Sequence, residues 1–234
     1  MLEKLKKEFS KLANPDKARN LEKYFKTGKG EYAEGDKFLG IVVPEQRKLV
    51  KKYAALLSLE EIQELLNTKI HEYRLTALLI LVKQYQKADE KIKKQIFDFY
   101  LKNTKNINNW DLVDLSSRDI VGNYLLDKDK SILYQLANSK DLWEKRIAII
   151  STSEFIRKSQ FDDTIKISEI LLKDKHDLIH KAVGWMLREV GKRNQEILES
   201  FLKKHRKIMP RTMLRYAIEK FPENKRKAFL DGTA

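Results

Sequence analysis

The sequence predicts an all-α protein built as a HEAT-like helical repeat solenoid, an α-α superhelix with a concave groove. Apolar residues recur with a period near 3.6 residues in almost every segment, and strand-like alternation is almost absent. A short motif also recurs every 34 to 36 residues, a period typical of helical repeats. With 234 residues, 42% of them hydrophobic, the chain can bury a substantial core. We therefore expect one repeat domain over residues 1–234.

The expected helices follow one another along the chain. The first ends at Asn14, and Pro15 can begin the second. A third is expected from about Pro44, and Ser58 with Glu61 forms a capping box that opens the fourth. The apolar stripes of the first six helices are Leu2, Leu5, Phe9 and Leu12; Leu21, Tyr24 and Phe25; Leu49, Val50 and Tyr53; Ile62, Leu65 and Leu66; Leu75, Leu78, Leu79 and Val82; and Ile92, Ile96 and Phe99. Further stripes continue in pairs to Phe221.

One glycine-rich segment interrupts the helices, at residues 27–36. It lacks the GxGxxG spacing and the preceding strand of a nucleotide-binding loop. The sequence therefore predicts a flexible loop here.

The composition favours a polyanionic partner. Lys and Arg number 48 against 34 Asp and Glu, which gives a net charge of +14 and a pI near 9.6. Nucleic acid is the leading candidate, and a Lys-rich solvated surface is the alternative. The chain has no cysteine, which excludes disulfides and Cys-based zinc sites and fits a reducing cytoplasm. It shows neither an apolar signal segment nor a stretch of membrane-spanning length, so we expect a soluble protein that is not secreted.

The repeated motif has five copies, and four of them begin with Arg or Lys. The copies are Arg74-Leu75-Thr76-Ala77, Trp110-Asp111-Leu112-Val113, Arg146-Ile147-Ala148-Ile149, Lys181-Ala182-Val183-Gly184 and Arg215-Tyr216-Ala217-Ile218. Places where one copy departs from the shared pattern are candidates for chemistry.

The second copy departs from the pattern twice. Trp110 replaces the basic residue, and Asp114 interrupts an otherwise apolar stripe one helical turn later. Trp185 holds the position equivalent to Asp114 two copies on, and Arg146 begins the copy between them. Stacked repeats would bring these four side chains to one surface. The alternative is structural, with Trp110 and Trp185 in the core and Asp114 paired with Arg146.

At these residues the chain resembles the AlkD family of DNA alkylation-repair glycosylases, which fold as HEAT-like repeats. The resemblance extends from about residue 24 to residue 230. The matching segments are Asn109-Trp110-Asp111-Leu112-Val113-Asp114, which resembles a W-D-x-V-D motif; Trp143-Glu144-Lys145-Arg146-Ile147-Ala148; Lys181 to Glu189; Phe38-Leu39-Gly40-Ile41; and Met209-Pro210-Arg211-Thr212 with Tyr216-Ala217. Some members carry Trp where this chain has Asn109.

The resemblance implies a monofunctional DNA N-glycosylase of base excision repair. Its substrates would be cationic alkylated purines, 3-methyladenine and 7-methylguanine, in double-stranded DNA bound in the concave groove. The implied site residues are Asp114 as the catalytic carboxylate, Trp110, Trp185 and Tyr24 beside the lesion, and Arg146, Lys181 and Arg188 on the DNA backbone. No metal or cofactor is implied, and we expect a monomer in the cytoplasm, associated with the nucleoid of a bacterium.

Three other interpretations remain open. His176 and His180 stand at i and i+4, but Asp177 breaks the HExxH pattern of a zinc enzyme, so paired surface or cap histidines are the simpler explanation. A HEAT-type scaffold could bind DNA or protein without cleaving it. The third interpretation is a partner made of RNA or an acidic protein.

Overall fold

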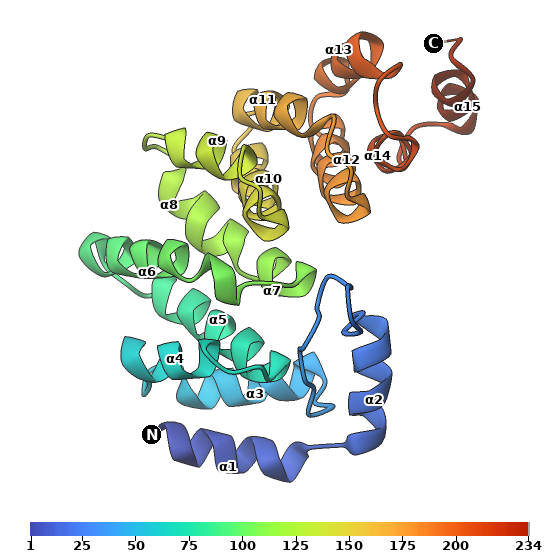
Figure 1. Ribbon diagram of the computed structural model, residues 1–234. Coiled ribbons are helices and arrows are strands. Elements are labelled where there is room, and N and C mark those ends of the chain that lie inside the picture. The colour runs from blue at the N-terminus through green and yellow to red at the C-terminus, as the bar shows by residue number, and fades with distance from the viewer. Residues whose placement is uncertain (234) are drawn as a thin grey trace. The chain divides into compact units, whose positions relative to one another are not determined.

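The computed structural model describes residues 1–233, and within them the protein is helical without strands (Figure 1). The only extended pairing among these residues is an isolated bridge between Lys37 and Ile70. The predicted all-α fold is confirmed. The chain divides into two compact units, unit 1 from Met1 to Ser116 and unit 2 from Ser117 onward. The single repeat domain over 1–234 stays a prediction, and each unit is described by itself.

Unit 1 contains seven α-helices among its described residues and a short 3₁₀ turn at Thr104–Asn106. The helices are α1 (Leu2–Leu12), α2 (Pro15–Tyr24), α3 (Val43–Tyr53), α4 (Leu59–Leu66), α5 (His71–Tyr85), α6 (Glu90–Lys102) and α7 (Trp110–Asp114). Helix α5 is buried along almost its whole length and packs against α3 and α4. It is the central helix of this unit.

Local signals in the sequence set several of these boundaries. Pro15 begins α2, and the Asn14 side chain accepts the Lys17 N–H at 3.0 Å. Both hydrogen bonds of the predicted capping box of α4 are present between Ser58 and Glu61. These helix starts are therefore confirmed.

The apolar stripe predicted for α6 is partly wrong. Ile96 is buried as expected, but Ile92 is 41% exposed and Phe99 only half-buried. Phe97 and Tyr100 are buried instead. Two apolar stripes are possible in this sequence, and the one that contains Tyr100 is the one buried against the neighbouring elements.

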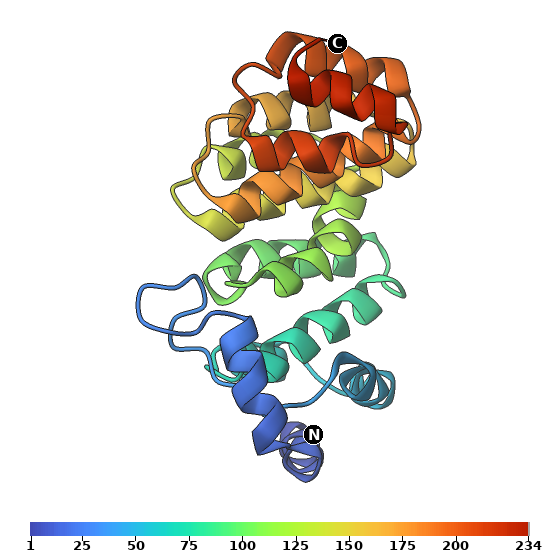
Figure 2. The same cartoon turned by 90° about the vertical axis from the view of Figure 1, so that its right-hand side faces the viewer.

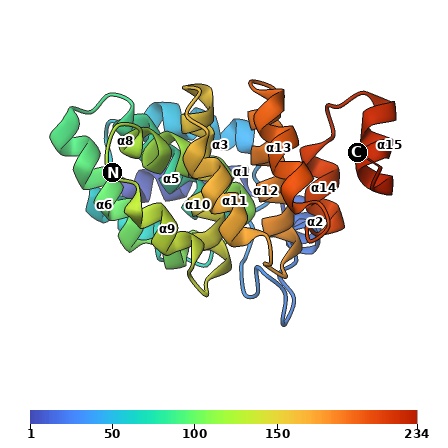
Figure 3. The same cartoon turned by 90° about the horizontal axis from the view of Figure 1, so that it is seen from above.

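Unit 2 begins with a π-helical turn at Arg118–Gly122. Its α-helices are α8 (Asn123–Leu125), α9 (Ser131–Ala137), α10 (Leu142–Arg157), α11 (Asp162–Leu171), α12 (Asp177–Gly191), α13 (Gln195–His205), α14 (Arg211–Ala217) and α15 (Glu223–Asp231). Helix α10 packs against α9, α11 and α12, and Figure 3 shows α13 and α14 beside α12. Helices thus pack on their sequence neighbours, as in a helical repeat solenoid.

Helices α12 and α14 approach each other closely at Gly184. A Cβ atom at this position would lie 2.5 Å from the Cβ of Tyr216 and 2.6 Å from the carbonyl oxygen of Met213. No side chain fits between the two backbones here, so the glycine sets their spacing.

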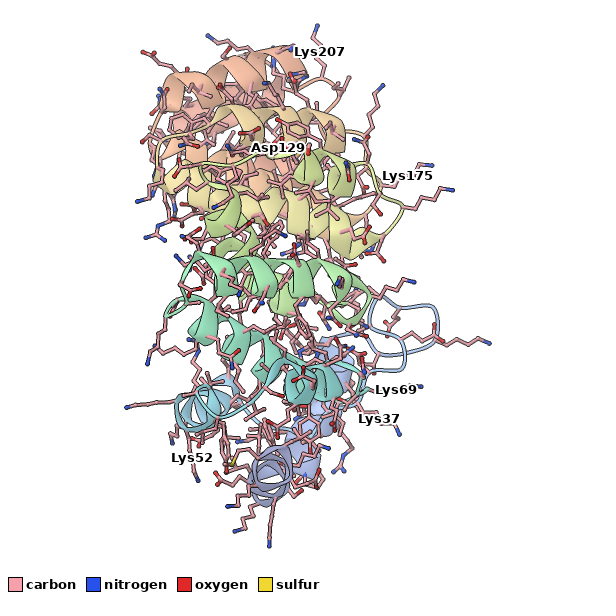
Figure 4. The ribbon with its side chains drawn as sticks, turned by 90° about the vertical axis from the view of Figure 1, so that its left-hand side faces the viewer. Lys37, Lys52, Lys69, Asp129, Lys175 and Lys207 are labelled. Carbon is pink, nitrogen blue, oxygen red and sulfur yellow. The ribbon has the colours of Figure 1, made fainter. Side chains whose placement is uncertain are left out.

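The glycine-rich loop between α2 and α3 projects from the rest of unit 1 (Figure 2). Within the loop, the side chain of Ala33 is fully buried, and the Gly30 N–H donates a 2.8 Å hydrogen bond to the Glu34 carboxylate. At its base the Lys37 N–H donates to the Lys69 carbonyl at 2.9 Å, and Figure 4 shows these two lysines close together. The sequence predicted a flexible loop, and the structure gives it defined hydrogen bonds.

No helix within residues 1–233 is long and apolar enough to cross a membrane.

Candidate functional site

Helix α7 carries two of the predicted site residues, Trp110 at its first position and Asp114 at its last. It is only 5 residues long, whereas α5, α10 and α12, which carry the first, third and fourth copies of the motif, have 15, 16 and 15 residues, and α14, which carries the start of the fifth, has 7. At the start of α7, the fully buried Asn109 side chain accepts the Trp110 N–H at 2.8 Å. The repeated helix is therefore interrupted at the carboxylate that the sequence singled out.

Asp114 lies at the edge of the core. Leu112 and Val113 before it are fully buried, whereas Asp114 itself is half-buried. Its negative charge interacts electrostatically with the phenol of Tyr100, and the Tyr100 hydroxyl is 2.9 Å from the Ser116 Oγ. Burial raises the pKa of Tyr100, the bond to Ser116 opposes this, and Asp114 raises it further. The carboxylate thus borders low-dielectric surroundings while keeping an exposed side.

Aromatic rings surround Trp110. The Phe25 ring stacks on the indole with centroids 5.3 Å apart and 21° between planes. Tyr24 makes an edge contact at 6.2 Å and is 64% exposed. Tyr32, from the glycine-rich loop, also contacts the indole, and its pKa is raised first by burial, while a hydrogen bond with Trp110 acts in the opposite direction. Tyr24 and Trp110, both predicted beside the lesion, are therefore neighbours in the structure.

Behind this aromatic group lies a buried ionic network that the sequence did not predict. His71, the first residue of α5, is 2% exposed, and its Nε2 lies 2.8 Å from the Asp111 Oδ2. Its Nδ1 lies 3.5 Å from the Asp36 Oδ2, an ionic contact without hydrogen-bond geometry. Arg74 bonds Asp36 through Nη2 and the Asn108 Oδ1 through Nη1. The network ties α5, α7 and the loop before Phe38 together.

Glu72 adds a third buried carboxylate next to His71. It accepts backbone N–H groups from Leu39, Gly40 and Ile41 at 2.8 to 3.2 Å. Hydrogen bonds from several N–H groups stabilise a carboxylate that has lost its water. This is the local reason why the segment Phe38-Leu39-Gly40-Ile41 turns toward α5.

A pocket of about 330 Å³ opens in unit 1 beside these groups. Its walls are mainly apolar, and it also contacts Tyr24, Phe25, His71 and Asp111. Through Tyr24 and Phe25 it adjoins Trp110.

Helix α12 of unit 2 carries Lys181, Trp185 and Arg188. The half-buried Trp185 follows Gly184, the point where α12 meets α14. Lys181 Nζ lies 2.6 Å from the Asp177 Oδ2, and the Lys181 side chain is 40% exposed. Arg188 pairs with Glu219, which lies just after the end of α14.

Arg146 lies on α10 and is only 5% exposed. Its Nη1 donates to the carbonyl of Leu178 at 2.6 Å, which links α10 to the first turn of α12. This contact gives Arg146 a structural task between the two helices, and both its role on DNA and its pairing with Asp114 stay predictions.

The paired histidines both make backbone contacts. The His176 Nδ1 accepts the Leu178 N–H at 3.1 Å and caps α12, and the His180 Nε2 lies 2.6 Å from the Asp174 carbonyl. Within the described part of the chain, no group of three or more His, Asp or Glu side chains could hold a metal ion.

Comparison with known proteins identifies the family. A family model described as DNA alkylation repair enzyme matches residues 5–221. The chain belongs to the DNA alkylation repair enzyme family. A solved structure titled as a predicted DNA alkylation repair enzyme from Enterococcus faecalis is similar, with a TM-score of 0.70 and 19% identity. The match covers 90% of this chain and 97% of that one, and at this identity it shows the fold. No curated protein matches the chain.

Within this DNA alkylation repair enzyme, sequence reasoning missed the network behind Trp110. No role was assigned to His71, Asp111 or Asp36 from the sequence. One signal was present, because Asp111 directly follows Trp110 in the motif. Asp36 gives no such signal in the sequence, because it meets His71 and Arg74 of α5 only after the loop has folded back onto this helix.

Proposed function

We propose that this DNA alkylation repair enzyme is a monofunctional DNA glycosylase that hydrolyses the N-glycosidic bond of cationic alkylated purines in duplex DNA. Its substrates are 3-methyladenine and 7-methylguanine. The observation that carries the proposal is the half-buried Asp114 at the end of the interrupted helix α7, one turn from Trp110 and its aromatic neighbours.

The reaction asks little of the protein. An N3- or N7-alkylated purine is cationic in the nucleotide, so the glycosidic electron pair leaves with the base and the released base is neutral. No general acid is needed. Water adds to C1′ and loses its proton to solvent. Asp114, ionised, stabilises the positive charge that develops on the sugar and orients that water.

Trp110 and Tyr24 give the selectivity for a cationic base. An aromatic face attracts a cation by on the order of 0.5 to 2 kcal/mol per contact, and a neutral purine lacks this gain. The stack on Phe25 holds the indole of Trp110 in place, so little side-chain entropy is lost when a base binds.

Unit 2 contributes contacts to the same DNA. Trp185 provides a further aromatic face, and Lys181, Arg188 and Arg146 contact phosphates of the DNA backbone. The net charge of +14 supports binding to duplex DNA.

Asp114→Asn is the decisive test. The amide keeps the shape of the carboxylate but has no charge, so base release should fall by about 10²-fold or more while DNA affinity changes little. Release of 3-methyladenine or 7-methylguanine from methylated duplex DNA and thermal melting are measured on one preparation.

Asp119→Asn is the matched control. Asp119 is also a half-buried aspartate, 25% exposed and paired with Arg118, and its loss should leave release unchanged. A wild-type protein that binds DNA but releases no base would identify a non-catalytic scaffold. A depressed melting temperature for Asp114→Asn, with release retained in the folded fraction, would assign Asp114 a structural role.

A further inference from the structure

His71 is a buried ionisable group for which the proposed reaction has no direct use. Each nitrogen of its ring faces a carboxylate, Asp111 from α7 and Asp36 from the loop. A neutral imidazole has one N–H, so its other nitrogen would turn a lone pair toward a carboxylate. The two carboxylates therefore favour the imidazolium form.

The remaining charges near His71 are already engaged. Arg74, one turn further along α5, bonds Asp36, and Glu72 accepts three backbone N–H groups. Asp111 has the Leu112 N–H at 2.9 Å in addition to His71. Burial lowers the pKa of His71, and the charge of Arg74 lowers it as well. The carboxylates of Asp111 and Asp36 raise it, and the net result is a pKa of about 9.

Two routes connect this imidazolium to Trp110. The first is covalent, because Asp111 is the next residue in the chain and lies in the first turn of α7. The second is a stack of rings. His71 packs on Phe38 at 4.6 Å and on Phe25 at 4.9 Å, and the opposite end of the stack is the contact between Phe25 and Trp110 at 5.3 Å.

We propose that protonated His71 is a positioning residue that fixes the first turn of α7 and the indole of Trp110 in the geometry used for base release. The proposal rests on the proposed glycosylase function for its effect on activity. Removing the proton leaves Asp111 and Asp36 facing an uncharged ring, so α7 loses its ionic anchor and the stack loses its cationic end. Trp110 then becomes mobile.

The first experiment measures Trp110 without reference to catalysis. Trp143→Phe with Trp185→Phe leaves Trp110 as the only indole, because the chain has three tryptophans. Acrylamide quenching of its fluorescence should increase when His71→Gln is added, and in the protein that retains His71 it should increase between pH 7 and about pH 9.5. The histidine ring itself, followed by NMR, should remain protonated until the pH approaches 9.

The second experiment measures base release at saturating DNA. His71→Gln should lower the single-turnover rate by about tenfold or more, because small misplacements of catalytic groups cost that much, while DNA affinity stays within about threefold. In the wild-type protein the rate should fall as the pH rises through about 9, and His71→Gln should lack this dependence.

His205→Gln is the matched control. His205 also contacts a carboxylate, Glu169 at 2.9 Å, and packs on a phenyl ring, Phe201 at 4.7 Å, but it lies on α13. It should leave Trp110 quenching and base release unchanged.

The positioning role would be overturned if His71→Gln changed neither the acrylamide quenching of Trp110 nor the rate of base release. It would also be overturned if the His71 ring titrated near its ordinary pKa of about 6.5. If His71→Gln fails to fold, the NMR titration and the pH-dependent quenching of the protein that retains His71 decide the question. If the wild-type protein releases no base, the proposed function fails, while the quenching and NMR results still decide whether His71 positions Trp110.

Discussion

Units 1 and 2 carry their charged side chains in different ways. In unit 1, Asp36, His71, Arg74 and Asp111 form one buried network behind an aromatic ring. In unit 2, the buried Arg146 and Glu154 make separate contacts, with the Leu178 carbonyl and Arg157 respectively. Pairs such as Lys181 with Asp177 lie on helix surfaces there, and close helix packing occurs at Gly184.

The difference indicates a division of tasks. Burying ionised groups costs free energy unless each is paired, and hydrophobic packing achieves the same stability more simply. A network of this kind beside Trp110 therefore suggests that unit 1 holds an aromatic surface in a fixed geometry. Cations on the surface of unit 2 remain accessible and can attract phosphates.

The largest effect expected from this comparison is that of Arg74→Met. The change leaves the buried Asp36 with only His71 as a cationic partner, and breaking a buried pair typically costs about 3 to 5 kcal/mol. Urea unfolding measures the destabilisation. Arg19→Met is the control, because the pair of Arg19 with Asp16 is exposed and should contribute less than about 1 kcal/mol. Equal destabilisation of the two variants would mean that the network contributes no more than a surface pair.

Much of unit 1's architecture could be predicted from local signals. The proline at the start of α2 and the capping box of α4 act within one turn, so they can be recognised from sequence alone. The anomaly of Asp114 was also visible, because this carboxylate interrupts the apolar stripe of Leu112, Val113 and Leu115.

The network around His71 could not be predicted in the same way. Its members come from positions 36, 71, 74 and 111, and their meeting depends on the path of the loop and on the packing of α7 against α5. The spacing of the repeats also could not predict that Arg146 is buried whereas Lys181 is partly exposed. Both begin a copy of the motif, yet Arg146 is 5% exposed, whereas the side chain of Lys181 is 40% exposed.

An intermediate effect is expected for Gly184→Ala in unit 2. The new methyl group would lie 2.5 Å from the Tyr216 Cβ and 2.6 Å from the backbone oxygen of Met213, so α12 and α14 must separate. Overpacking of this kind typically costs about 1 to 3 kcal/mol, seen as a lower midpoint of urea unfolding. Gly28→Ala is the control, because its Cβ would meet only the flexible Glu31 side chain. A Gly184→Ala protein as stable as wild type would show that these two helices can shift at no cost.

The smallest effect on stability is expected for Lys181→Ala, which tests whether the surface cations of unit 2 bind DNA. The ion pair with Asp177 lies on a helix surface, so its removal should cost less than about 0.5 kcal/mol. If the Lys181 ammonium neutralises one phosphate of duplex DNA, the substitution should reduce the slope of log affinity against log salt by about 0.9. Because a phosphate carries no base information, the affinity for methylated and unmethylated DNA should fall equally.

Two further variants separate this prediction from a general effect of charge. Lys204→Ala removes the same charge and also breaks a surface pair, with Glu169, but on α13, which carries no copy of the motif. Its salt slope should stay at the wild-type value. Arg146→Met should lower the melting temperature instead, because the Leu178 carbonyl loses its donor. If Lys181→Ala and Lys204→Ala changed the slope equally, the DNA would be responding to net charge, and the motif position of Lys181 would have no special part in binding.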